Sequence, residues 1–184
     1  MLNIPKELMK DKPMSKTHFK FMVKHFKNRD KEYPPLNKIK KTKIKEGSIV
    51  LDYGCGPGSY SIVAAQVVGN LGEVYAADIH PLAIEEVKKR AKEKGLINIE
   101  TILTDCDTNL EENSIDVVLL LDIYHDLSDP ENILRELHRV LKKEGSLSVD
   151  DHHFKDDEII NKITSIKLFK FSERKEELFN FIKV

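Results

Sequence analysis

The chain has 184 residues, of which 40% are hydrophobic and 33% charged, and its net charge is −1. This length and balance fit one globular domain and exclude a disordered or fibrous chain. No apolar run reaches the length of a membrane span, and no apolar signal segment follows the N-terminus, so we expect a cytoplasmic protein without membrane contact.

Residues 1–46 form a basic leader with 14 Lys and Arg against 5 Asp and Glu, whereas the remaining residues carry 16 against 26. Apolar residues at helical spacing from Phe19 to Phe26 predict an amphipathic helix, which the pair Pro34-Pro35 ends. A second short helix is expected over residues 36–43. We expect this leader to lie on the main domain, residues 47–184, as a helical lid. We expect the lysines of this leader to face solvent. The alternative is that they bind an anion such as nucleic acid.

From residue 47 onward, short apolar strands alternate with helical periods. Strands are predicted over residues 49–51, 74–77, 99–103, 117–121 and 147–149. Helices are predicted over residues 59–68, 81–94, 130–141 (closed by Gly145) and 155–164. A terminal hairpin is predicted from residues 166–171 and 178–183, joined by a charged turn at 173–177. The alternation predicts an α/β fold, a three-layer sandwich whose mostly parallel sheet carries helices on both faces.

The first predicted strand runs into a glycine loop with the sequence Asp52-Tyr53-Gly54-Cys55-Gly56-Pro57-Gly58. Alternate glycines remove side chains where the backbone turns tightly and approaches a ligand. The helix predicted from Ser59 directs its amide groups and positive dipole end at whatever occupies the loop. Because ligands of open α/β sheets bind at the carboxyl ends of the strands, this loop is the expected binding site.

Two ligand classes use such a loop, and charge distinguishes them. A dinucleotide site has the spacing Gly-x-Gly-x-x-Gly and holds a pyrophosphate at the helix start, whereas the glycines here are spaced two and two. The carboxylate of Asp52 would repel a pyrophosphate and attract the ammonium group of a methionine moiety. This pattern favours S-adenosylmethionine over a nicotinamide dinucleotide and disfavours an oxidoreductase.

Four segments in chain order, within roughly residues 47–150, resemble motifs of the class I, Rossmann-like S-adenosylmethionine-dependent methyltransferases. They are the glycine loop, the acids that follow the second and third strands, the segment from Leu121 to Leu127, and residues 134–145 before the fifth strand. The resemblance implies a seven-stranded sheet in the order 3-2-1-4-5-7-6 with strand 7 antiparallel. Glu144 before Gly145 departs from the family pattern, at a turn distant from the expected cofactor.

The resemblance also implies a set of cofactor-binding residues. Asp78 would hold the ribose hydroxyls, Ile79 would pack on adenine, and Asp105 would approach the adenine amino group. The full set expected to bind S-adenosylmethionine is Asp52, Gly54, Cys55, Gly56, Gly58, Asp78, Ile79, Asp105, Cys106 and Asp122. For Asp78 the offset from the glycine loop also fits a ribose-binding acid.

His125 and His152 are the candidate catalytic residues. A base is needed only if the methyl acceptor must lose a proton, and histidine titrates near neutrality at the expected ends of strands four and five. The run from Asp150 to His153 has two further interpretations. It is a surface loop that caps the next helix, or Asp151, His152 and His153 form a metal site together with His125. Two cysteines are too few for a structural zinc site, and we expect no resident metal ion.

Two features of the sequence bear on the identity of the methyl acceptor. The domain is close to a minimal core, and no Asn-Pro-Pro-Tyr motif or added nucleic-acid module is present. A small-molecule acceptor is therefore the first expectation, and a protein or RNA acceptor bound through the basic leader is the second. A module that binds S-adenosylmethionine without catalysis is the alternative from another class. The sequence gives no indication of oligomeric state.

Overall fold

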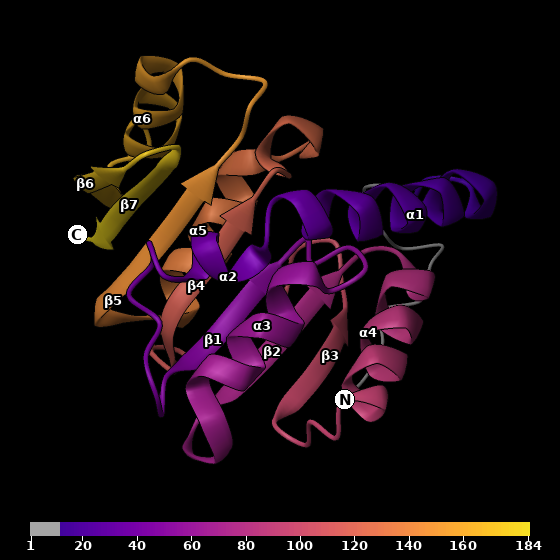
Figure 1. The fold of residues 1–184 in the computed structure, drawn as a ribbon. Coiled ribbons are helices and arrows are strands. Elements are labelled where there is room, and N and C mark those ends of the chain that lie inside the picture. Colours follow the sequence, from indigo (N-terminus) through magenta and orange to yellow (C-terminus); the bar gives the residue numbers. More distant parts are fainter. Residues whose placement is uncertain (1–11) are drawn as a thin grey trace.

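A seven-stranded sheet forms the middle layer of the structure, a computed structural model that describes residues 12–184 (Figure 1). The strands are β1 (Ile49–Tyr53), β2 (Glu73–Asp78), β3 (Ile99–Leu103), β4 (Ile115–Leu121), β5 (Leu141–Asp150), β6 (Phe169–Lys175) and β7 (Leu178–Lys183). Their order is β3-β2-β1-β4-β5-β7-β6. The neighbours among β1 to β5 are parallel, and β7 runs antiparallel to β5 and β6. The predicted fold class and strand order are confirmed.

Helices cover both faces of the sheet and one of its ends. They are α1 (Lys16–Glu32), α2 (Pro35–Ile39), α3 (Ser59–Val68), α4 (Pro81–Glu93), α5 (Pro130–Val140) and α6 (Asp156–Thr164), with short 3-10 turns at Gly69–Leu71 and Tyr124–Asp126. Helix α1 lies across the end of the sheet where β1 and β2 finish (Figure 1). Within residues 12–184, no helix combines the length and the apolar character that a membrane crossing requires.

The core consists of apolar clusters on the two faces of the sheet. Val50 and Val74 pack with α2 and α3, whereas Leu51 and Leu120 pack with α5 and α6. Successive residues of a strand point to opposite faces, so strands that are covered on both sides are apolar throughout. This is why the predicted strands appear in the sequence as continuous apolar runs.

The prediction that Gly145 closes the fifth helix is wrong. Helix α5 ends at Val140, and β5 begins at Leu141 instead of residue 147. Leu141 pairs with Ile115 before a shift in register, and a Cβ on Gly145 would lie 3.0 Å from the carbonyl oxygen of Asp116. The glycine therefore permits close packing inside the strand pair.

The boundaries of two other predicted elements are also wrong. Strand β6 starts at Phe169 and runs to Lys175, so the charged segment predicted as a turn mostly belongs to the strand. Arg174 and Lys175 pair with β7 residues on the edge of the sheet, where charged side chains remain in solvent. Helix α2 ends at Ile39 rather than at residue 43, and a turn follows in which the N–H and the hydroxyl of Thr42 both donate to the Ile39 carbonyl.

Candidate functional site

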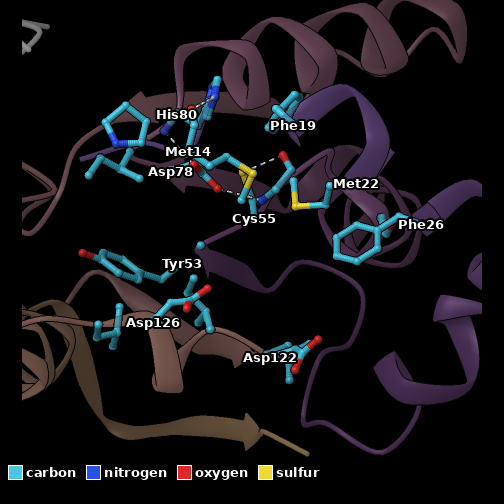
Figure 2. Close-up of a pocket in the computed structure, with 18 of the residues that line it drawn as sticks. Met14, Phe19, Met22, Phe26, Tyr53, Cys55, Asp78, His80, Asp122 and Asp126 are labelled. Atoms are coloured by element: carbon cyan, nitrogen blue, oxygen red, sulfur yellow. Dashed lines mark hydrogen bonds between the residues drawn. The ribbon is translucent and has the colours of Figure 1, made fainter. Parts of the chain in front are cut away.

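A cavity of about 440 Å³ lies at the carboxyl ends of the first four strands, beneath α1. Figure 2 shows Asp78 and His80 on one side of this space and Asp122 and Asp126 on the other. Its wall also contains Met14, Phe19, Met22, Phe26, Arg29, Tyr53, Gly54, Cys55, Gly56, Ser59, Tyr60, Ile79, Thr104, Asp105, Leu121, Ile123 and Leu127. The wall is mostly apolar with a few carboxylates, and its volume fits a cofactor-sized ligand.

The loop between β1 and α3 brings backbone, rather than side chains, to the cavity. Gly54 has a φ of +75°, and a Cβ there would lie 2.5 Å from Cγ1 of Ile123. Gly58 has a φ of +78°, and a Cβ there would lie 2.7 Å from Cγ2 of Val87. Both positions therefore require glycine for conformation and for space. Gly54 lines the cavity, whereas Gly58 lies behind it at the start of α3.

Asp78 connects the glycine loop to the start of α4. Its Oδ2 accepts the backbone N–H of Gly56 at 2.8 Å, and its Oδ1 accepts that of His80 at 2.7 Å. Burial raises the pKa of Asp78, while these two hydrogen bonds oppose the rise. Each carboxylate oxygen keeps a second acceptor site. The side chain lines the cavity and can therefore accept hydrogen bonds from a ligand as well.

Asp52, which the sequence analysis predicts to bind the cofactor, does not line the cavity. The side chain points from β1 toward α3, where its Oδ2 accepts the hydroxyl of Ser61 at 2.5 Å. It is only 2% exposed, and burial raises its pKa to about 6. The alternation of a strand places Tyr53 on the opposite side, and the tyrosine is the residue that reaches the cavity.

The structure separates the remaining predicted cofactor residues into two groups. Ile79, Asp105 and Cys55 line the cavity, whereas Cys106 does not. Burial raises the pKa of the Cys55 thiol well above its usual range, so the group is neutral and behaves as a small apolar side chain. Cys106 instead packs at the margin of the core cluster that contains α5.

Asp122 follows β4 and lines the cavity. Its backbone has a φ of 56°, in the left-handed region that residues other than glycine seldom adopt. Its N–H donates to the carbonyl of Asp150 at 2.6 Å, which ties the ends of β4 and β5 together. Its side-chain Oδ1 is buried and makes no hydrogen bond with residues 12–184.

The two segments that follow β4 and β5 meet in a cluster around Asp151. The Asp151 Oδ2 lies 2.9 Å from Nδ1 of His125, and its Oδ1 lies 3.1 Å from Nδ1 of His153. The two imidazole centroids are 3.6 Å apart. Asp151 is 1% exposed. Burial tends to raise the pKa of Asp151, but hydrogen bonds from His125 and His153 hold it below its ordinary value.

His125 and His152, the two predicted catalytic residues, lie close together and outside the cavity wall. The His152 side chain is 71% exposed, and its Nδ1 lies 2.6 Å from Oδ1 of Asp122. His125 is more enclosed, because Asp151 accepts both its backbone N–H and its Nδ1. His153, which was not among the predicted catalytic residues, shares Asp151 with His125 and lies closer to it than His152 does.

Several cavity residues from α1 were not predicted as site residues. Phe19, Met22, Phe26 and Arg29 line the cavity, and the ring of Phe19 stacks on His80 at 4.4 Å. The helical spacing from Phe19 to Phe26 was the signal in the sequence, since it marked an apolar face that needs a partner. Residues 1–11 of the leader lie outside the described residues.

Comparisons with known proteins identify the family of the chain. A family model described as a methyltransferase domain matches residues 44–178. The ubiquinone/menaquinone biosynthesis C-methyltransferase UbiE of Blochmanniella pennsylvanica is 30% identical over 134 residues, which cover 71% of this chain and 52% of that protein. An (S)-coclaurine N-methyltransferase of Thalictrum flavum is 28% identical over 110 residues, 60% of this chain and 30% of that protein. The chain thus spans about half the length of these curated relatives, or less.

Two solved structures cover nearly the whole chain. A SAM-dependent methyltransferase from Aquifex aeolicus has a TM-score of 0.80 at 23% identity, covering 92% of this chain and 100% of its own. A putative S-adenosyl-L-methionine-dependent methyltransferase from Methanococcus maripaludis has a TM-score of 0.78 at 18% identity, covering 95% and 96%. At these sequence identities, the structural similarity shows that the fold is shared and no more. Because the family model covers most of the chain, the protein belongs to the methyltransferase domain family, and the resemblance to class I enzymes is confirmed.

Proposed function

We propose that this chain transfers a methyl group from S-adenosylmethionine to a small-molecule acceptor. The observation that carries the proposal is the cavity into which the glycine-loop backbone, Asp78 and Asp122 all face. Membership of the methyltransferase family supports the same reaction. The named relatives act on small molecules, coclaurine and quinones, according to their names.

The cavity offers a place for each part of the cofactor. The second acceptor sites of Asp78 suit the two ribose hydroxyls, and Ile79 and Asp105 provide an apolar surface and an acceptor for adenine. The N-terminus of α3 favours the carboxylate of the methionine moiety. Asp122 favours the ammonium group, and buried Asp52 adds to that attraction through its field.

Methyl transfer is an in-line displacement in which the cofactor supplies the reactive group. The acceptor atom forms a bond to the methyl carbon, the bond from that carbon to the sulfonium sulfur breaks, and neutral S-adenosylhomocysteine leaves. An acceptor that began as O–H, N–H or S–H also gives up a proton. The chain contributes mainly by holding the acceptor in line with the methyl group, beneath α1.

We assign the removal of that proton to the cluster of His125, His153 and Asp151. Asp151 fixes the orientation of both imidazoles through their Nδ1 atoms, as a carboxylate does for a catalytic histidine. The cluster reaches the cavity through Asp122 and Asp126, which line it and lie beside the histidines. His152, in contact with Asp122, is the second candidate for this role.

Methyl transfer from a labelled cofactor tests the proposed function. The chain would be incubated with methyl-labelled S-adenosylmethionine and separate pools of phenols, thiols, amines, quinols, protein and RNA. We expect label to appear in one of the small-molecule pools, and to fall strongly in the His125→Ala variant. Transfer only to protein or RNA would contradict the assigned acceptor class. Binding of the cofactor with no transfer to any pool would support a module without catalysis.

A further inference from the structure

We propose that Asp122, His125, Asp151 and His153 bind a divalent transition-metal ion of the Zn²⁺ class. Each of the four residues offers a ligand atom, and these atoms all lie within 4.8 Å of one another. The ion site stands on this geometry alone, whereas its part in activating the acceptor rests on the proposed function. The sequence predicts no resident metal ion, and the alternative metal site that it suggests contains His152 in place of Asp122.

The donor set and its spacing fit such an ion. Ligand atoms about 2.0–2.1 Å from a tetrahedral ion lie roughly 3.3 Å from one another. The Asp151 oxygens lie 2.9 Å and 3.1 Å from the Nδ1 atoms of His125 and His153, so small movements would open room for an ion between them. Two imidazoles with two carboxylates suit zinc and its neighbours in the first transition row, whereas magnesium and calcium prefer oxygen alone.

Asp122 brings a partly buried carboxylate to the cluster. Its Oδ1 makes no hydrogen bond with residues 12–184 and lies 2.6 Å from Nδ1 of the exposed His152 side chain. A cation at the cluster would take the place of this contact as the partner of the oxygen.

The charges around the cluster also attract a cation. Asp122 and Asp151 carry two negative charges, and Oδ2 of Asp126 lies 3.5 Å from Nε2 of His125. The nearby cation Lys38 does not pair with the cluster. It pairs with Asp150, the last residue of β5, which directly precedes Asp151. With neutral histidines, the four proposed ligands therefore present a net charge of −2 to an ion.

The position of the cluster suggests what the ion does. Asp122 belongs both to the proposed metal site and to the cavity wall, so a bound ion lies next to the methyl acceptor. With the ion bound, His125 and His153 would be ligands and no longer the base, and Asp122 would face the ion rather than the ammonium group of the cofactor. An O–H or S–H acceptor that coordinated the ion would lose its proton to solvent more readily, because the ion stabilises the anion. The anion then attacks the methyl carbon, the carbon–sulfur bond of the sulfonium breaks, and S-adenosylhomocysteine leaves as before. The substrate class that fits is a small molecule with a metal-binding hydroxyl or thiol.

Cobalt provides the direct test. Full-length protein is treated with a chelator, dialysed and titrated with Co²⁺ alone, whose visible absorption reports tetrahedral coordination, and with Zn²⁺ alone by calorimetry. We expect one ion per chain. The His153→Gln variant should bind about tenfold or more weakly. The matched control His138→Gln, a histidine outside the cluster, should bind as the unaltered protein does.

Circular dichroism and binding of S-adenosylhomocysteine establish that each variant is folded, and His125→Gln replaces His153→Gln if the latter fails to fold. Protein that gives neither a cobalt band nor heat with Zn²⁺ overturns the metal site. Equal affinity in His153→Gln and His138→Gln also overturns it, because the ion then binds elsewhere. Binding of S-adenosylhomocysteine without binding of metal leaves the proposed function intact, whereas binding of metal without any methyl transfer contradicts that function alone.

Discussion

At the scale of single residues, three acids at the ends of neighbouring strands lie in three different environments. Asp52 is buried against α3 beside Ser61, Asp78 accepts two backbone N–H groups, and Asp122 keeps an oxygen without a hydrogen bond among the described residues. All three follow short apolar runs, and the sequence predicts a cofactor contact for each without showing which carboxylates face the cavity. Their environments depend on which face of the sheet each side chain meets and on what packs against it.

Replacing Asp78 with Asn should weaken the binding of S-adenosylhomocysteine by about 10- to 100-fold, the range for a lost hydrogen bond to a charged group. An amide keeps the shape of the side chain but offers one acceptor oxygen in place of two. The N–H of Gly56 or His80 then also loses its partner. Calorimetry measures the affinity, and Asp107→Asn, at an exposed neighbour of Asp105, is the control. Unchanged affinity in Asp78→Asn would remove the ribose assignment.

Replacing Asp52 with Asn should change how stability depends on pH. Burial raises the pKa of Asp52 to about 6, from about 3.9 in the unfolded chain. The folded protein then holds the proton more tightly, so this group makes the free energy of unfolding fall as the pH rises from about 4 to about 6. A pKa difference of about two units changes the free energy of unfolding by up to about 3 kcal/mol.

Urea unfolding of ligand-free protein at pH 4.5 and pH 7.5 checks this prediction. The Asn amide still accepts the Ser61 hydroxyl and carries no charge, so Asp52→Asn should lose less stability than the unaltered protein between the two pH values. An equal loss in both proteins would show that Asp52 is already ionised at pH 4.5 and would contradict the assigned environment.

At the scale of elements, α1 is the part of the leader that completes the cavity. Phe19 is 3% exposed and stacks on His80, the residue that caps α4. Asp30 of the same helix accepts the hydroxyl of Ser59 at the start of α3. The helix is thus attached at both sides of the proposed cofactor, and we propose that it acts as a lid.

The substitution Phe19→Ala should loosen this lid. Loss of a buried phenylalanine costs about 3 kcal/mol of stability. Here it should weaken the packing of α1 on the domain and leave the packing within the sheet unchanged. Hydrogen exchange of α1 amides should become faster and cofactor affinity should fall, while β1 and β4 stay protected. Phe21→Ala is the matched control, because Phe21 lies on the same helix and is 68% exposed. Equal effects of the two substitutions would contradict the docking assigned to Phe19.

Gly54 of the glycine loop can be compared with Gly95, which follows α4 and has a similar backbone conformation. Gly54 and Gly95 have φ values of +75° and +64°, but a Cβ on Gly95 would meet nothing within 4 Å. Gly95→Ala should cost about 1 kcal/mol of strain and leave cofactor affinity unchanged. Gly54→Ala should cost more, because its Cβ overlaps Ile123, and should also weaken cofactor binding. Equal losses in thermal unfolding and binding would show that space at Gly54 is unimportant.

Elements with a strong local signal were predicted with correct bounds. Residues 99–103 and 59–68 match β3 and α3, since an apolar run and a glycine-flanked helix define them. The start of β5 was missed because Leu141 continues the apolar stripe of α5, and only its pairing with Ile115 makes it a strand. The end of β6 was missed because charged residues on an edge strand have the composition of a turn.

At the scale of the whole molecule, the strand order places the binding cavity. The parallel strands β1 and β4 are neighbours, so the chain crosses over on opposite sides of them and opens a crevice at their carboxyl ends. The resemblance predicted this order and the cavity residues that follow β1 to β4, but not those that α1 contributes. The cluster of His125, Asp151 and His153 was only partly foreseen, because its geometry depends on how the ends of β4 and β5 are joined through Asp122 and Asp150.

The central claim is that the cavity beneath α1 binds an adenosyl sulfonium cofactor. Titration calorimetry of the full chain with S-adenosylhomocysteine, followed by NAD⁺ under the same conditions, tests it most directly. The account predicts one site per chain for S-adenosylhomocysteine, weakened in Asp78→Asn, and no heat with NAD⁺. A chain that binds NAD⁺ and gives no heat with S-adenosylhomocysteine would contradict it.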